Sequence, residues 1–177
     1  MKQTFVAGFL YLVSLAVQAK APSPGIVNSC LSTVSTSKTV RYAHTKNISV
    51  NEIAEVDDDR IGAEKLATVV DVGKDTFGMW TSKAPKGYGL VYNGKEMPLH
   101  RVIRLDKRHA PVELNLYKSI YGVASEGNSS YLCVTFNFDG LGESGTYQNI
   151  RGLYLIDRTP RAFKAYYTAG DIRRSKR

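Results

Sequence analysis

The chain is poor in the residue types that build metal centres. It has only three histidines, and they are scattered without the spacing of metal ligands. We therefore predict no metal site and no cofactor. No internal repeat and no heptad pattern is present, which argues against repeat and coiled-coil architectures.

Long apolar runs are also scarce, and the single clear one is N-terminal. Residues 5–17 are almost wholly apolar, Lys2 precedes them, and the small residues around Ala19 suit a signal peptidase. This pattern predicts a signal peptide over residues 1–19, with Ala21 as an alternative cut. The run is too short to span a bilayer comfortably, which weakens the alternative of a membrane anchor. We expect a secreted protein without a transmembrane segment.

Acidic residues are outnumbered by basic ones. The 24 Lys and Arg against 16 Asp and Glu give a net charge of +8. Removing residues 1–19 takes away only Lys2, so the mature chain has 177 − 19 = 158 residues and a charge of 23 − 16 = +7. That length suits one domain, and the basic balance permits binding to RNA, acidic glycans or anionic membranes.

Cysteine is limited to Cys30 and Cys133, both beyond the predicted cleavage site. In an oxidising compartment we expect them to form a disulfide, the alternative being two buried thiols. Two N-glycosylation sequons begin at Asn47 and Asn128, and the second lies in a polar segment where an acceptor is accessible.

The order of elements predicts a single α+β domain over residues 39–168. Residues 20–38 are rich in Pro, Ser and Thr and are expected to form an extended arm, and residues 169–177 a basic tail. Ser49 and Glu52 form a capping box, and apolar residues recur at helical spacing to Val70, which predicts a helix over 50–70. Six strand-like segments follow, so we expect one helix packed on an antiparallel sheet.

A glycine-rich stretch is compatible with two structures. Gly140, Gly142 and Gly145 have the spacing of a nucleotide-binding turn, but the next segment, 151–157, alternates like a strand rather than a helix. Tyr154 and Ile156 are predicted to face one way and the residues between them the other. We therefore interpret the stretch as the connection of a β-hairpin.

Several short motifs occur in the order found in a known family. "GKEMPLH" (94–100), "VTFN" (134–137) and "RGLYLI" (151–156) resemble strands of the guanyl-specific fungal ribonucleases. "KNISVNEIAEV" (46–56) resembles the helix opening of the RNase-like secreted effectors of powdery mildew fungi. The resemblance covers about residues 40–157 and implies a microbial ribonuclease-like fold, with one helix on a curved antiparallel sheet.

The same resemblance implies a catalytically dead protein. Glu96 takes the position of the family's general base, but Cys133 stands at the arginine position and Ile156 at the histidine position. Phe77 and Met79 fall, in a looser alignment, near the Tyr and His of another segment. RNA cleavage needs an acid, a base and a cation on the phosphoryl oxygens, and a lone carboxylate supplies only the base.

A basic stretch offers a binding surface. His100 and His109 flank a dense basic patch of Arg101, Arg104, Lys107 and Arg108, which is predicted to form a phosphate-contacting edge, with nearby aromatic residues available for base stacking. The candidate binding residues are Trp80, Tyr88, Tyr92, Glu96, His100, Arg101 and Arg104. One alternative is a solvated turn between strands. Another is an acid–base pair of Glu96 and His100, which stand about 13 Å apart along a strand, too far to pair directly.

From these patterns we expect a secreted, monomeric virulence effector that is not an enzyme. The resemblance implies that it enters host cells, binds a host protein or RNA, and is detected by a plant immune receptor. The alternatives are an active secreted ribonuclease with a rearranged site, and an extracellular inhibitor or adhesion module on an unrelated β-rich fold.

Overall fold

Two β-meanders account for most of the described chain. The computed structural model describes residues 21–45, 48–58, 63–83, 86–138, 150–158 and 163–171. The first sheet has the order β2 (Ile48–Asp58), β3 (Ala63–Val72), β4 (Asp75–Lys83), β5 (Lys86–Tyr92) and β6 (Lys95–Pro98). The second has the order β1 (Arg41–His44), β8 (Ile120–Glu126), β9 (Ser129–Asn137), β10 (Ile150–Asp157), β11 (Ala165–Asp171) and β7 (Ile103–Arg104).

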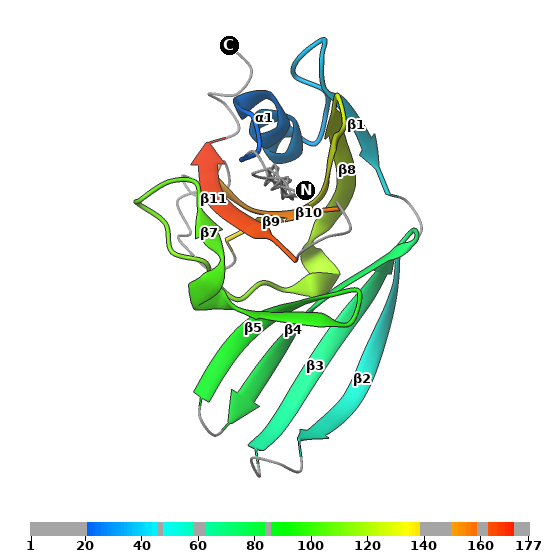
Figure 1. Cartoon of the computed structure of the whole chain (residues 1–177), viewed down its shortest axis with the longest axis vertical. Coiled ribbons are helices and arrows are strands. Elements are labelled where there is room, and N and C mark those ends of the chain that lie inside the picture. Colours follow the sequence, from blue (N-terminus) through cyan, green and yellow to red (C-terminus); the bar gives the residue numbers. More distant parts are fainter. Residues whose placement is uncertain are drawn as a thin grey trace, which may run out of the picture.

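The larger core lies between the two sheets. Figure 1 shows the five-stranded sheet below the six-stranded one, with the lower parts of β3 and β4 extending away from the six-stranded sheet. Alternate residues of each strand enter this core, because successive side chains of a strand point to opposite faces. Its members include Val70, Phe77, Leu90, Leu132, Val134, Tyr154, Ile156 and Tyr167.

A helix covers the opposite face of the six-stranded sheet. Helix α1 (Pro24–Ser32) is capped at its N-terminus by Ser23, whose Oγ accepts a hydrogen bond from the Ile26 amide at 3.2 Å. Its buried residues pack against Leu153, Leu155 and other residues on this face of the sheet. Figure 1 shows α1 lying over the six-stranded sheet, on the side away from the five-stranded one. The helix, one sheet, the main core and the second sheet therefore form successive layers.

The predicted disulfide is confirmed. Cys30 of α1 and Cys133 of β9 are bonded at an S–S distance of 2.07 Å. Both residues are fully buried in the layer between the helix and the six-stranded sheet. The bond therefore fixes the helix to the centre of the sheet.

The predicted fold class is wrong. The protein is mostly β, with two sheets and one α-helix in the described residues, and not a single helix on a curved sheet. The predicted helix over 50–70 is the antiparallel pair β2–β3. Val50 pairs with Val70 and Ile53 with Ala67 across the two strands. The apolar residues that have the spacing of one helical face are therefore the same residues that pair across this hairpin.

The helix that does form lies in the predicted arm. The prediction of an extended segment over 20–38 is wrong for residues 24–32. Ser23 and Pro24 provide an N-cap and a favourable first helical residue, a local signal that the high Pro, Ser and Thr content of the segment obscures. The helix is short because Thr33 takes a left-handed backbone conformation at its C-terminus.

The structure of the C-terminal strands agrees better with the prediction from the sequence. β9 and β10 pair in antiparallel fashion, as the hairpin interpretation requires, while the glycines between them lie outside the described residues. Tyr154 and Ile156 face the inter-sheet core, and Leu153 and Leu155 face α1, so the two pairs lie on opposite faces as predicted. Residues 1–20, 172–177 and the sequon at Asn47 also lie outside the described residues.

Candidate functional site

The segment that follows β6 and leads into the six-stranded sheet carries a dense set of cations. We name residues 100–109 the basic loop. It leaves β6 through the 3-10 helix η1 (Leu99–Arg101), forms β7 beside β11 and then turns outward. The side chains of Arg101, Arg104, Lys107 and Arg108 are all exposed. The loop therefore presents four positive charges on one short segment, anchored at the edge of the six-stranded sheet.

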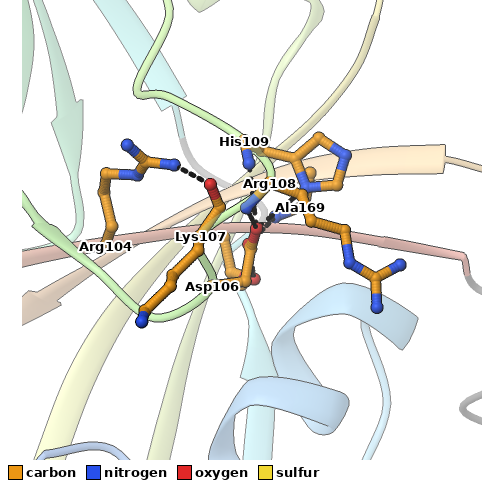
Figure 2. Close-up of polar contacts among 7 residues, drawn as sticks. Arg104, Asp106, Lys107, Arg108, His109 and Ala169 are labelled. Carbon is orange, nitrogen blue, oxygen red and sulfur yellow. Dashed lines mark hydrogen bonds and ion pairs between the residues drawn. The ribbon is translucent and has the colours of Figure 1, made fainter.

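The carboxylate of Asp106 organises the turn of this loop (Figure 2). Its Oδ1 accepts hydrogen bonds from the backbone N–H groups of Arg108 at 2.8 Å and His109 at 2.9 Å, and from His109 Nδ1 at 3.1 Å. Its Oδ2 accepts from Thr168 Oγ1 at 2.7 Å and from the Ala169 N–H at 3.3 Å, both on β11. One side chain thus shapes the loop and ties it to the sheet.

These contacts keep Asp106 charged. Burial alone raises the pKa of this carboxyl group, but the hydrogen bonds from Thr168 and from three backbone N–H groups outweigh burial. The net result is a pKa lowered from 3.8 to about 2. The loop therefore holds one fixed anion beneath its exposed cations.

The cations point in two directions from this anchor. Figure 2 shows Arg104 and Lys107 on one side of Asp106, and Arg108 and the His109 ring on the other. The Arg104 guanidinium donates a hydrogen bond to the backbone carbonyl of Lys107, which fixes its orientation. A polyanion crossing the loop can meet cations on both sides of the turn.

The predicted aromatic partners do not lie on this loop. Tyr92 is buried between the sheets, where its hydroxyl donates a hydrogen bond to Asp75 at 3.0 Å, and burial together with this bond raises its pKa to about 12. Trp80 is buried on the outer face of the five-stranded sheet, under Lys65 Nζ at 4.2 Å from its ring centroid. Tyr88 lines a separate hollow with Lys86.

Glu96 also lies apart from the basic loop. It is on β6, opposite Val91, and pairs with Lys65 on the outer face that holds Trp80. Of the candidate binding residues, only His100, Arg101 and Arg104 come together in the basic loop. Asp106 is absent from the residues predicted from the sequence, although a lone acid between Arg104 and Arg108 is a recognisable signal for a turn anchor.

The positions matched to the ribonuclease motifs are dispersed. Glu96 is on the outer face of one sheet, whereas Cys133 faces α1 on the other and is bonded to Cys30. Ile156, Phe77 and Met79 are buried in the inter-sheet core. The structure therefore does not bring these positions into one cleft.

Other predicted features have simple locations. Asn128 is exposed in the turn between β8 and β9, next to Gly127, whose φ of 57° suits glycine. Within the described ranges there is no cluster of three or more potential metal ligands. Nor does the described part of the chain contain a helix long and apolar enough to cross a membrane.

Comparison with family models, with curated proteins and with solved structures finds no match for this chain. Its function is therefore inferred from its residues and their geometry.

Proposed function

We propose that this is a secreted, non-catalytic binding protein whose basic loop contacts the phosphates of RNA. The observation that carries the proposal is the set of four exposed cations on a loop held in place by Asp106. Phosphate contacts by Lys and Arg supply most of the affinity in sequence-independent nucleic-acid binding. Secretion is proposed from the predicted signal peptide over residues 1–19. The further proposal that the protein acts on a host, where an immune receptor detects it, rests on the short sequence motifs alone, since the ribonuclease-like fold that they imply does not form.

A salt titration with labelled single-stranded RNA tests this function. We compare the mature wild type with a loop variant carrying Gln at Arg101, Arg104, Lys107 and Arg108. A matched control carries Gln at four other exposed cations, Lys38, Arg41, Lys74 and Lys95, so that both variants lose the same charge.

The two variants have different expected results. The loop variant should bind at least about tenfold more weakly at moderate salt and lose about 2 to 3 units of the slope of log K against log salt, since each contact contributes about 0.7. The control should retain most of both. Equal weakening of RNA binding in the two variants would show that only net charge matters. Because the proposed protein is not catalytic, the RNA should also be intact after incubation with it.

One contact favours a second candidate, a ribonuclease with a rearranged site. His109 Nδ1 lies 3.1 Å from the Asp106 carboxylate, an arrangement that orients an imidazole for proton transfer. The Arg108 guanidinium is on the same side in Figure 2 and could stabilise phosphoryl oxygens. Cleavage that disappears in His109→Gln but persists in Glu96→Ala would support this candidate over the non-catalytic one.

A further inference from the structure

A hollow lies where the basic loop turns away from the end of the six-stranded sheet. β7 pairs with Tyr166 and Tyr167 of β11, and beyond this pairing Asp106 ties the loop to Ala169 further along the strand. The hollow has a volume of about 430 Å³, within the range of small-ligand sites. The residues that line it include Asp106, Arg108, His109, Ile150, Ala169 and Asp171. We name it the loop hollow.

The floor of the loop hollow is the end of the strand pair β10–β11. Ile150 and Asp171 are opposite each other in this pair, and all three floor residues, Ile150, Ala169 and Asp171, are half-buried. Because side chains alternate along a strand, Ile150 lies on the same face as Tyr154, and Ala169 on the same face as Tyr167. Both tyrosines belong to the inter-sheet core. The floor therefore continues this core outward and adds one carboxylate to it.

The wall of the loop hollow carries two flat side chains. Figure 2 shows the Arg108 guanidinium and the His109 ring on the side of Asp106 where Ala169 lies. The His109 side chain is 39% exposed, and its ring is held by the contact of 3.1 Å with the Asp106 carboxylate. Unstacked RNA bases pack on imidazole rings and on guanidinium planes. The wall therefore provides a stacking surface whose orientation is already fixed.

The charge of the loop hollow disfavours a phosphate inside it. Arg108 contributes one positive charge, and Asp106 and Asp171 contribute two negative ones, so the sum is 1 − 2 = −1 with histidine counted as neutral. A neutral ring with an amino group fits this environment better. Carboxylate oxygens are acceptors only, each with room for more than one hydrogen bond, and Asp accepts from the exocyclic amine of cytosine.

We propose that the loop hollow binds one base of a single-stranded RNA whose phosphates lie on the basic loop, with a preference for cytosine over uracil. The base packs on Ile150 and Ala169 and stacks on the His109 ring. Its exocyclic amine donates a hydrogen bond to the Asp171 carboxylate. This inference rests on the proposed RNA binding and adds to it the recognition of a base, which phosphate contacts alone do not supply.

The probes are three fluorescent strands of equal length, about eight nucleotides each: oligocytidine, oligouridine and a strand of abasic ribose units. Their dissociation constants are measured by polarisation at one salt concentration. Ala169→Leu fills the hollow without a change of charge, and its matched control is Ala43→Leu, because Ala43 is exposed on β1 at the opposite edge of the same sheet. Asp171→Asn removes the proposed carboxylate acceptor. Thermal melts establish that each variant is folded.

The wild type should bind oligocytidine at least about fivefold more tightly than oligouridine, and oligouridine at least about fivefold more tightly than the abasic strand. In Ala169→Leu both ratios should fall close to one while the abasic strand binds as before, and Ala43→Leu should keep both ratios. Asp171→Asn adds a positive charge that strengthens binding of all three strands alike. Its ratio of cytidine to uridine affinity should nevertheless fall, because the carboxylate is lost.

Equal affinity of the wild type for the three strands would overturn the proposal and leave phosphate binding by the basic loop intact. Base preferences that persist in Ala169→Leu would mean that the base lies elsewhere and would reject the hollow. An unchanged cytidine-to-uridine ratio in Asp171→Asn would likewise contradict the proposed amine contact. The failure of RNA binding itself has a different signature: all three strands bind the wild type no better than they bind the loop variant.

Discussion

At the residue scale, the Asp106 carboxylate accepts five hydrogen bonds, three from within the basic loop and two from β11. Replacing Asp106 with Asn adds one unit of net positive charge and exchanges one of the two acceptor oxygens for an NH2 donor, so the donors in the loop and on β11 can no longer all be satisfied. If charge alone determined RNA binding, the variant would bind more tightly. We expect instead about threefold to tenfold weaker binding in the salt titration, because the cations lose their fixed positions. Tighter binding would contradict a role for loop order.

The same residue gives a pH dependence of stability. The pKa of Asp106 is lowered from 3.8 to about 2 in the folded protein, so its stabilising contribution is complete above about pH 4 and is lost as the pH falls towards 2. Because the side chain is partly exposed, we expect only roughly 1 to 2 kcal/mol. Urea unfolding of wild type and Asp106→Asn at several pH values measures it, and parallel profiles would contradict the assignment.

At the element scale, two ion pairs, each formed by one basic and one acidic side chain, differ in how deeply they are buried. Arg158, after β10, pairs with Asp75 on β4 at 2.7 Å, with side chains only 17% and 7% exposed. Glu96 pairs with Lys65 within one sheet and is 40% exposed. The first pair joins the two sheets, and the second lies on a surface.

Removing one partner of each pair should therefore have unequal effects on the free energy of unfolding. Asp75→Asn leaves Arg158 buried without its counter-ion and should cost about 3 kcal/mol or more. Glu96→Gln should cost less than about 1 kcal/mol, because an exposed pair contributes little. Urea unfolding of both variants measures the difference, and similar costs would show that the inter-sheet pair does not hold the layers together.

The disulfide between α1 and β9 makes a different contribution. It closes a loop with a sequence separation of 103 residues, for which the chain-entropy model gives roughly 4 to 5 kcal/mol. A variant with Ala at Cys30 and Cys133 should lose about this much stability, and hydrogen exchange should speed up first in residues 24–32. Unchanged protection of α1 would indicate that packing alone fixes the helix.

The elements also show what the sequence could predict. Alternation in Leu153–Ile156, together with the turn residues before it, predicts β10 and its hairpin partner correctly. The prediction of a helix over 50–70 failed because Val50, Ile53 and Val70 satisfy a helical period and a cross-strand register equally well. Local propensity does not choose between the helix and the strand pair. The division of strands into two sheets depends on long-range packing that no local pattern encodes.

At the scale of the whole molecule, the candidate site lies where the chain passes from the five-stranded sheet to the six-stranded one. The basic loop belongs to the stretch from β6 to β8. The sequence predicted the cations at Arg101 and Arg104 because charge density is visible locally.

The most direct test of the central claim is an NMR titration of the isotope-labelled mature protein with single-stranded RNA at low and moderate salt. We predict that the largest amide shift changes fall on the basic loop and on residues 168–170 of β11, and that they shrink as salt rises. Changes centred away from the basic loop, or none at all with RNA in excess, would contradict RNA binding by the basic loop.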